Sequence, residues 1–328
     1  MPGPIYTFGD YLKGRFSRKT HKVTVNAGLS CPNRDGSKGR GGCTYCDNRS
    51  FSPNARISIP AIGEQIEAGK RVVRRRTGAA QVLAYFQAYS NTYAPVEDLR
   101  RLYDQALQCA DVVGLVIGTR PDCVDHDILD LLVSYQSRGL EVWLEYGLQS
   151  AHDETLARIN RGHDFAEYQQ AVHETRQRGL PVCTHLILGL PGEDRDMMIE
   201  TLARVRETGT DGIKFHPLHV VRHTMLAHQW RRQSLPLLSQ TEYVALVCDM
   251  LEQMPADWVV HRLTGTASRD MLLAPDWCEK KWSVINAIYA DMHRRGSHQG
   301  CKLEIQTDVL SPAPARLTAA PCAAARHC

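Results

Sequence analysis

Three cysteines lie in one short segment, CPNRDGSKGRGGCTYCDN, at residues 31–48. Eleven residues separate Cys31 from Cys43, and two residues separate Cys43 from Cys46. In a reducing compartment, thiolates gathered in this way are typically metal ligands. In a zinc site, a fourth protein ligand would complete a tetrahedron. In an iron–sulfur site, the three cysteines would bind a [4Fe–4S] cluster and leave one iron open to an exogenous ligand.

The segment contains no fourth cysteine and no histidine. His21 lies ten residues upstream, and the next cysteine after Cys46 is Cys109. The long first loop is no obstacle, because closing eleven residues rather than three costs roughly 1 kcal/mol more, whereas a structural metal site contributes about 10 kcal/mol. The glycines of this loop allow backbone N–H groups to approach a cluster. These features favour the iron–sulfur interpretation over the zinc interpretation.

The elements that must position the cysteines alternate along the chain. β-rich runs are followed by segments with apolar residues at helical spacing. This alternation predicts an α/β fold with a parallel sheet, either doubly wound or closed toward a barrel, with ligands at the C-terminal ends of the strands. The predicted strands are residues 21–27, 81–89, 111–118, 140–149, 180–189 and 211–221, and the predicted helices are residues 95–110, 125–139, 165–179 and 194–209.

The pattern changes after residue 235, where we expect two helices, 241–254 and 278–296, and a strand, 257–263. The end of the chain is rich in alanine and proline and has little to bury, so we expect it to be disordered. The predicted division is a basic N-terminal segment (1–20), a core (21–235), an extension (236–310) and a disordered tail (311–328).

The composition indicates a globular protein without a membrane span. The chain has 328 residues, of which 43% are hydrophobic, and a net charge of +3. An odd number of cysteines, eleven, fits the reducing cytosol better than a disulfide framework, and the N-terminus lacks a signal peptide, so we expect a cytoplasmic protein. Basic residues gather at 13–22 and 70–76, and both groups could bind a phosphate-bearing partner. For residues 70–76 the alternative is a solvated helix face.

Five motifs carry a resemblance to a known family. The chain resembles the radical S-adenosylmethionine (SAM) superfamily from about residue 5 to residue 305, and within it the YhcC/YtqA-type proteins, relatives of the radical-SAM half of the Elongator catalytic subunit. The cysteine spacing resembles the Elongator-like branch rather than the commoner spacing of three and two residues. The acetyltransferase domain of that subunit has no counterpart in these residues. The motifs are CPNRDGSKGRGGCTYCDN, YFQAYSNTYAP, GTRPDCV, LEYGLQSAHDETLARINRGH and LILGLPGE.

The resemblance implies a partial (β/α)6 TIM-like barrel with a small α+β C-terminal extension. It also implies that Cys31, Cys43 and Cys46 hold a [4Fe–4S] cluster whose open iron is chelated by SAM. An electron from a donor such as flavodoxin or ferredoxin would then cleave SAM to a 5′-deoxyadenosyl radical that abstracts hydrogen from a substrate. The Elongator relationship points to a wobble uridine of transfer RNA (tRNA) as that substrate. A small metabolite or a protein is the alternative, and a non-catalytic zinc-stabilised nucleic-acid-binding module is the second alternative.

Several strand-end residues are candidate SAM contacts. Glu145 lies in an otherwise apolar strand on the same face as Trp143 and Gly147. A carboxylate there needs a partner, which the ribose or amine of SAM would supply. Through the resemblance, Tyr45 covers the adenine, or alternatively packs as a loop aromatic, and Arg120 pairs with the SAM carboxylate or a substrate phosphate, or alternatively forms a surface ion pair. The remaining candidates are Asn91 with its neighbours Ser90 and Thr92, Thr119, Gln149, Ser150 and Gly189.

The last predicted strand of the repeat supplies the candidate catalytic residues. Lys214 and His216 lie on one face of it, and His219 lies on the opposite face. Lys214 and His216 would face the substrate, or they would be satisfied polar residues at the rim of the barrel.

Overall fold

The computed structural model describes residues 3–51, 59–233 and 235–303. At its centre is a seven-stranded sheet, in the order β1-β2-β3-β4-β5-β6-β8, whose neighbouring strands all pair in parallel. The chain order of β1 to β6 is the order expected when crossover connections join parallel strands, and it confirms the predicted α/β partial barrel. The strands are β1 (Thr20–Val25), β2 (Gln81–Phe86), β3 (Val112–Thr119), β4 (Glu141–Gln149), β5 (Val182–Leu188), β6 (Gly212–Pro217) and β8 (Val259–Arg262).

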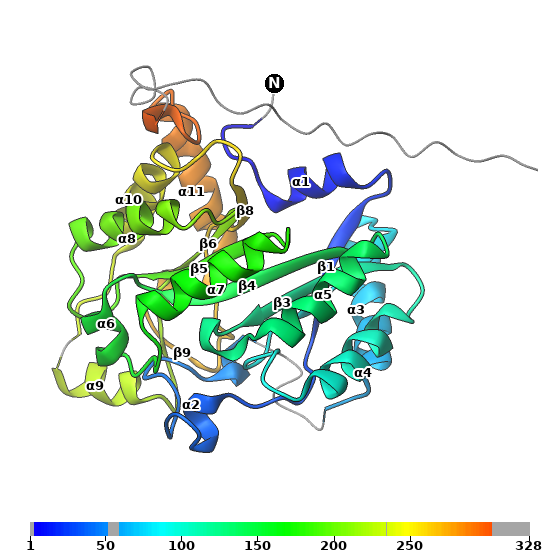
Figure 1. The fold of residues 1–328 in the computed structure, drawn as a ribbon. Helices are drawn as coiled ribbons and strands as arrows, with labels where there is room; N and C mark the ends of the chain where they lie inside the picture. Colours follow the sequence, from blue (N-terminus) through cyan, green and yellow to red (C-terminus); the bar gives the residue numbers. More distant parts are fainter. Residues whose placement is uncertain (1–2, 52–58, 234, 304–328) are drawn as a thin grey trace, which may run out of the picture.

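Helices cover the outer face of this curved sheet (Figure 1). The main apolar core lies between the sheet and these helices, and Phe86, Ile117 and Leu144 of three neighbouring strands are fully buried in it. The four predicted crossover helices are confirmed, each within a few residues of its predicted ends. The helices are α2 (Pro32–Asp35), α3 (Ile62–Thr77), α4 (Val96–Leu107), α5 (His126–Ser137), α6 (Asp153–Arg158), α7 (Phe165–Gln177), α8 (Arg195–Glu207), α9 (Met225–Gln233), α10 (Gln240–Glu252) and α11 (Lys281–Arg294).

Helix α1 (Phe8–Arg15) packs on the inner face of the sheet, near the N-terminal ends of the strands. Thr7 begins the helix with a capping box. The Phe8 ring lies with its centroid 5.8 Å from that of Trp143 and 4.2 Å from that of His261. The helix therefore fills the end of the barrel interior that is remote from the cysteine loop.

The N-terminal segment is thus part of the barrel rather than a basic arm. Arg15 forms an ion pair with the buried Glu141 at 2.9 Å, and Lys22 on β1 forms one with the buried Glu145, also at 2.9 Å. Lys22 is therefore directed into the barrel, whereas the Arg15 side chain remains half exposed beside the end of β4. The prediction of a phosphate-bearing partner for this region stays a prediction.

The C-terminal extension is joined to the core through the sheet itself. Strand β8 pairs with β6, and the backbone N–H of Val260 donates to the carbonyl of Tyr6 at 2.9 Å. The predicted strand and both predicted helices of this region are confirmed as β8, α10 and α11. A separate two-stranded sheet pairs β7 (Val220–Val221) with β9 (Leu272–Ala274). The predicted tail 311–328 lies outside the described residues.

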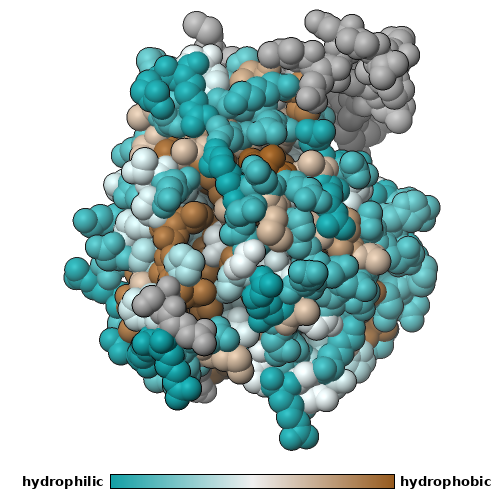
Figure 2. All heavy atoms as spheres, turned by 90° about the vertical axis from the view of Figure 1, so that its left-hand side faces the viewer, coloured by the Kyte–Doolittle hydropathy of each residue, from teal (hydrophilic) through white to brown (hydrophobic). Residues whose placement is uncertain are grey.

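A second apolar cluster packs α6 and α9 onto the ends of β5 and β6. Figure 2 shows the face that carries α6, α8 and α9, which is mostly hydrophilic with a hydrophobic strip near its middle. Within the described residues, no helix combines the length and apolar character that crossing a membrane requires.

Candidate active site

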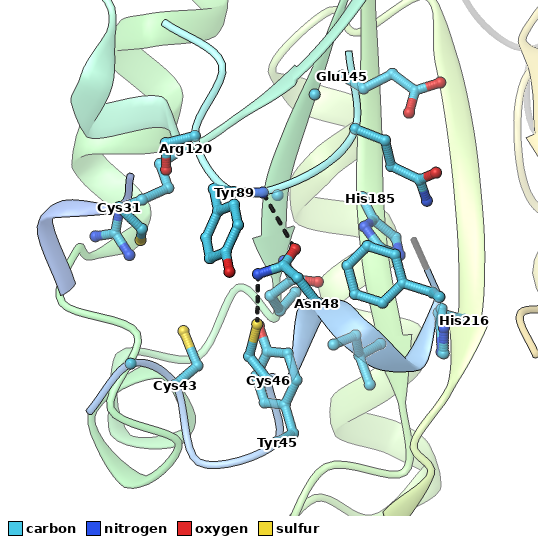
Figure 3. A pocket seen from close by; sticks show the side chains of 18 of the residues that line it. Cys31, Cys43, Tyr45, Cys46, Asn48, Tyr89, Arg120, Glu145, His185 and His216 are labelled. Atoms are coloured by element: carbon cyan, nitrogen blue, oxygen red, sulfur yellow. Dashed lines mark hydrogen bonds between the residues drawn. The ribbon is translucent and has the colours of Figure 1, made fainter. Parts of the chain in front are cut away.

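The three cysteines lie beyond the C-terminal end of β1 and line one pocket (Figure 3). Cys31 precedes α2, and Cys43 and Cys46 lie in a turn where the Cys46 N–H donates to the Cys43 carbonyl at 3.0 Å. The ends of β2, β3, β4, β5 and β6 complete the pocket, which encloses about 1100 Å³, part of it continuous with solvent. The fold therefore brings the cysteines to the edge of the sheet where the strand alternation predicted a ligand site.

The three sulfur atoms do not converge on a single point. Among the described residues, the one set of three Cys, His, Asp or Glu ligand atoms that lie within 4.8 Å of one another comprises Glu145, Cys183 and His261. Sulfur atoms around one zinc ion, at 2.3 Å from the metal, would lie about 3.8 Å apart. Cysteines that bind different irons of a cluster need not approach so closely. In the described structure the three cysteine sulfur atoms do not form such a closely spaced set.

Polar groups surround the two cysteines at the end of the segment. Asn33 Nδ2 and Arg161 Nη1 each donate to Cys43 Sγ at 3.6 Å. Asn48 Nδ2 donates to Cys46 Sγ at 3.9 Å, as drawn in Figure 3. Donors at such distances stabilise negative charge on sulfur, which a thiolate-bound cluster carries.

The pKa values of the Cys43 and Cys46 thiols are shifted in opposite directions. Burial disfavours the Cys43 thiolate, but the Arg161 guanidinium outweighs burial, so the pKa of Cys43 is lowered. Burial and the nearby Cys43 raise the pKa of Cys46 to about 12. The protein itself stabilises one thiolate of this pair, and a second thiolate needs an additional cationic partner, such as the iron ions of a cluster.

Arg161 reaches Cys43 by crossing over Gly147 on β4. Its Nε donates to the Gly147 carbonyl at 3.1 Å. A Cβ atom at position 147 would lie 2.8 Å from Arg161 Nη2 and 2.7 Å from Gln149 Nε2, so a side chain there would displace the ends of these two side chains. The LEYGLQ motif thus allows the arginine to reach the cysteine.

A buried ionic cluster occupies the inner wall of the barrel around Glu145. The carboxylate forms ion pairs with Lys214 at 2.6 Å and with Lys22 at 2.9 Å, and it accepts hydrogen bonds from Tyr85 at 2.6 Å and His261 at 2.9 Å. Burial would raise the pKa of Glu145, but Lys214 and Lys22 outweigh it and hold this pKa well below its usual range.

Glu145 was predicted to pair with SAM, and the structure supplies protein partners for both oxygens of its carboxylate instead. Figure 3 shows Glu145 across the pocket from Cys43 and Cys46. Its proximity to Cys183 and His261 does not indicate a second metal site either, because the two lysine ammonium groups already neutralise the carboxylate. The sequence argument correctly required a partner for Glu145, but two of its partners come from β1 and β8, which are remote in sequence.

Three histidines lie beside this cluster. Lys214 and His216 both line the pocket, as predicted, and so do His185 and His219. The prediction that His219 faces the other side is wrong: β6 ends at Pro217, the alternation stops there, and the His219 ring centroid lies 4.6 Å from that of His216. Lys214 itself is satisfied by Glu145 and by the Tyr85 hydroxyl.

Comparison with known proteins identifies the family. The Radical SAM superfamily matches residues 33–205, more than half of the chain, and the Radical_SAM C-terminal domain matches residues 210–294. Protein YhcC of Escherichia coli is 50% identical over 292 residues, which are 89% of this chain and 93% of the relative; YtqA of Bacillus subtilis is 41% identical over 90% of this chain and 91% of its own length. The chain belongs to the radical SAM superfamily.

More distant radical SAM relatives share part of the chain or the fold alone. Elongator complex protein 3 of Mus musculus is 30% identical over 155 residues, 46% of this chain and 27% of that protein. The archaeal Methanocaldococcus infernus Elp3 structure has a TM-score of 0.59 at 18% identity, and the match covers 85% of this chain and 64% of that one. At this identity the similarity supports the fold of the radical SAM core and nothing more specific.

Radical SAM enzymes bind SAM and a [4Fe–4S] cluster, and the pocket contains polar atoms that lack partners within the described part of the protein. Ser90 Oγ and Gln149 Oε1 are buried, make no hydrogen bond and belong to pocket-lining residues. Thr119 also lines the pocket. Buried polar groups require partners, so the Ser90 and Gln149 atoms fit a polar ligand such as SAM. Asn91 is not among the residues that line the pocket; it donates from Nδ2 to a β3 carbonyl at 2.8 Å, and its buried Oδ1 has no partner in the described structure.

Two other predicted SAM contacts already have protein partners. Arg120 donates to the buried Asp122 from Nε at 2.9 Å and to the Arg161 carbonyl from Nη1 at 2.7 Å. Burial opposes the charge of Asp122, but Arg120 outweighs it, and the pKa of Asp122 falls to about 2. The Ser150 hydroxyl donates to Glu193. The alternative of an ion pair for Arg120 is therefore observed, although the pair is buried rather than exposed.

Tyr45 and Gly189 are the last two residues that were predicted to contact SAM. Tyr45 lines it and also packs against the apolar cluster under α6 and α9. Gly189 ends β5 with φ of +86°, and a Cβ there would meet Leu238 at 3.1 Å. The backbone requirement for glycine at this turn is clear, and its contact with adenine stays a prediction.

A second hollow lies next to the first and shares Cys43 and Cys46 with it. Arg34, Arg40 and Arg49 line it together with Tyr89 and His223. Arg34 donates to the Cys46 carbonyl at 2.6 Å, and Arg49 pairs with Asp47. This basic rim surrounds the opening next to the cysteine loop.

Sequence reasoning missed several residues that contact the cysteines or line the pocket. Asn33 and Asn48 lie in the cysteine segment, and Arg161 lies in the quoted motif LARINRGH, but no role was assigned to them. His185 and Arg262 each interrupt a short apolar strand. The signal that singled out Glu145, a charged or polar residue facing inward on an apolar strand, would also have found these two.

Proposed function

We propose that this radical SAM protein binds a [4Fe–4S] cluster through Cys31, Cys43 and Cys46 and acts on a modified wobble uridine of tRNA. The observation that carries the cluster assignment is the arrangement of the three cysteines around one pocket of a radical SAM fold. Their neighbours Ser90 and Gln149 supply unpartnered polar atoms for SAM.

When bound together, the cluster and SAM supply one-electron cleavage of SAM to a 5′-deoxyadenosyl radical. The chain's own residues hold and shield that chemistry. The three thiolates ligate iron, while Arg161 and Asn33 donate to Cys43 and orient it. Tyr45 and the strand ends line the pocket and would limit the access of water to the bound groups. A low-potential donor such as flavodoxin or ferredoxin would deliver the electron.

Support for an RNA substrate comes from the opening of the pocket. The basic rim formed by Arg34, Arg40 and Arg49, with Tyr89 among them, combines cations with an aromatic ring, which suits an unpaired nucleotide and its phosphates. The resemblance to the Elongator subunit points to the same substrate. Basic and aromatic side chains near the C-terminal end of the described residues are mixed in this respect. Trp277 is buried and Arg295 pairs with acidic residues of α10 and α11, whereas Trp282 is exposed.

The substrate is tested by comparing tRNA nucleosides from wild-type cells and cells that lack this protein, using mass spectrometry. Loss or replacement of one wobble-uridine derivative, restored by the wild-type gene and not by a Cys43→Ala variant, is the expected result. An unchanged nucleoside profile would exclude tRNA modification and leave a small metabolite or a protein as the substrate of the same site.

The cluster is tested on anaerobically reconstituted protein. A brown protein with about four irons per chain is expected. A colourless protein that retains only zinc would support the non-catalytic module instead.

A further inference from the structure

Arg262 is a cation on the inner wall of the barrel whose charge has no acidic partner in the described structure. It ends β8 and lines the same pocket as the cysteines. Its Nε donates to the Phe215 carbonyl at 3.4 Å, and its Nη2 donates to His185 Nε2 at 3.1 Å. A guanidinium has five N–H donors, so most of the donors of Arg262 remain available to a ligand.

The contacts of the neighbouring histidines fix where their protons lie. Arg262 can only donate, so His185 Nε2 accepts and the proton of neutral His185 is on Nδ1. Burial, together with the charges of Lys214 and Arg262, holds the pKa of His185 well below its usual range, which keeps the ring neutral. The Nδ1–H of His185 has no recorded partner among the described residues and is a second donor beside the guanidinium.

The charges on this wall do not balance. Lys22, Lys214 and Arg262 are three cations, and Glu145 is the single carboxylate that faces them. The other acidic residue of the pocket lining, Asp47, is held by Arg49 on the rim. A buried charge without a counter-charge raises the free energy of the folded protein. Binding of an anionic ligand beside Arg262 would therefore be favourable.

We propose that Arg262 and His185 form a subsite for an anionic oxygen group of the substrate, a phosphate or a carboxylate. The guanidinium matches either group with two parallel hydrogen bonds. Figure 3 shows His185 and His216 on the side of the pocket away from Cys31 and Cys43, so the anion is held apart from the cysteines. His219, whose buried Nδ1 has no partner, lies next to His216 and adds a polar group to the same wall. The subsite rests on the proposed function, because it assigns this pocket to the substrate.

The test measures anion binding to the full-length, anaerobically reconstituted protein by isothermal titration calorimetry, with SAM present at saturation. The ligands are inorganic phosphate, acetate, uridine 5′-monophosphate and uridine. Binding of phosphate and uridine monophosphate, without binding of uridine, identifies a phosphate subsite, and preferential binding of acetate identifies a carboxylate subsite. Both results support the proposal and separate the two sources of the anion.

Substitutions of Arg262 and His185 test whether the anion binds at this wall of the barrel. Arg262→Gln should lower the affinity for the anion about tenfold or more, since a charged hydrogen-bonding partner is lost. Arg100→Gln, the same substitution in a solvent-exposed i,i+3 ion pair on α4, should leave affinity unchanged. If thermal melting shows that Arg262→Gln does not fold, His185→Phe is the second variant. It replaces one ring by another of similar size and removes both the Nδ1–H donor and the Nε2 acceptor of Arg262, so it should weaken anion binding several-fold.

Two outcomes would contradict the proposal of an anion subsite. Either native protein binds no anion at millimolar concentration, or the Arg262→Gln and His185→Phe variants bind as tightly as native protein. A third measurement addresses SAM itself: if phosphate binds without SAM and is displaced by SAM, the subsite belongs to the SAM carboxylate and the assignment to substrate fails. None of these measurements requires turnover, so reductive cleavage of SAM by the native protein tests the proposed function separately.

Discussion

Two charged residues on the inner wall of the barrel have opposite surroundings. Glu145 on β4 is contacted by Lys22, Lys214, Tyr85 and His261, and we call these five residues the closed cluster. Among the residues that the structure describes, the partners of Arg262 on β8 are a carbonyl and a neutral histidine, and Arg262 lines the pocket. We call the pocket-facing groups without full partners the open wall, which comprises Cys31, Cys43, Cys46, Ser90, Gln149 and Arg262.

The groups of the closed cluster bond to one another and stabilise the fold. The groups of the open wall face the pocket and are available to bind a ligand. A fully bonded carboxylate has no capacity left for a ligand, and removing it leaves two buried ammonium groups unpaired. A thiol, hydroxyl or guanidinium that faces a cavity without a partner is satisfied only when something binds. Substitutions in the closed cluster should therefore change stability, and substitutions in the open wall should change what the protein binds.

The largest effect is expected for Cys43→Ala in the open wall. Bound iron should fall from about four atoms per chain to nearly none, because three thiolates are the minimum that holds the cluster. The free energy of unfolding of the metal-free chain should change by only about 1 kcal/mol. Iron analysis and urea denaturation measure the two quantities. Cys109→Ala, at a partly exposed cysteine outside the pocket, is the matched control and should keep its iron.

Glu145→Gln should have the largest effect on stability. Loss of the carboxylate leaves Lys22 and Lys214 without their counter-ion, and we expect the free energy of unfolding to fall by about 3–5 kcal/mol. Chemical denaturation of the metal-free protein measures this change. Arg262→Gln, which removes one partnerless charge, should cost about 1 kcal/mol or less. Equal losses for the two variants would contradict the distinction between the closed cluster and the open wall.

Lys214 should give the closed cluster a pH-dependent stability. Burial lowers the pKa of Lys214 to about 8, with repulsion from Arg262 and Lys22 adding to it and Glu145 opposing it, while the unfolded chain keeps a pKa near 10.5. Between these values the unfolded state binds more protons, so the free energy of unfolding rises with pH; the destabilising charge is fully present below pH 8.

The measurement compares native protein with Lys214→Met between pH 7 and pH 10.5, using chemical denaturation at each pH. Relative to the variant, native protein should gain stability as pH increases across this range. Parallel curves would show that Lys214 titrates as it does in the unfolded chain and that the closed cluster does not shift its pKa.

The smallest effect concerns Arg161, which donates to Cys43 Sγ. Arg161→Gln removes a positive charge beside the cluster and should lower its reduction potential by about 40 mV, the equivalent of about 1 kcal/mol for one electron. A potentiometric titration followed by electron paramagnetic resonance measures it. Arg158→Gln, on the neighbouring helix α6, should leave the potential unchanged. A shift to higher potential in Arg161→Gln would show that the guanidinium does not stabilise the reduced cluster.

The sequence predicted the parallel strands and the pocket-lining cysteines because both depend on local signals. β-rich runs and cysteine spacing can be read within a few residues, and β4 and β5 lie within their predicted ranges. Helix α1 was missed because its sequence, FGDYLKGR, has only a short apolar pattern among polar and basic residues. Its role depends on Trp143 and His261, which are more than a hundred residues away.

The partners of the polar residues were harder to predict for the same reason. Glu145 meets Lys22 across 123 positions and His261 across 116 positions. Arg161 meets Cys43 across 118 positions. Strand alternation shows that a side chain faces inward, but which inward side chains meet depends on the curvature of the sheet and on how β8 joins it.

The most direct test of the account is reductive cleavage of SAM. The native protein is reconstituted with iron and sulfide without oxygen, reduced with dithionite and incubated with SAM, and 5′-deoxyadenosine and methionine are quantified by liquid chromatography and mass spectrometry. We predict both products from native protein and from Cys109→Ala, and neither from Cys43→Ala. A native protein loaded with four irons that forms no 5′-deoxyadenosine, or a Cys43→Ala variant that forms it at the native rate, would contradict the assignment of this pocket.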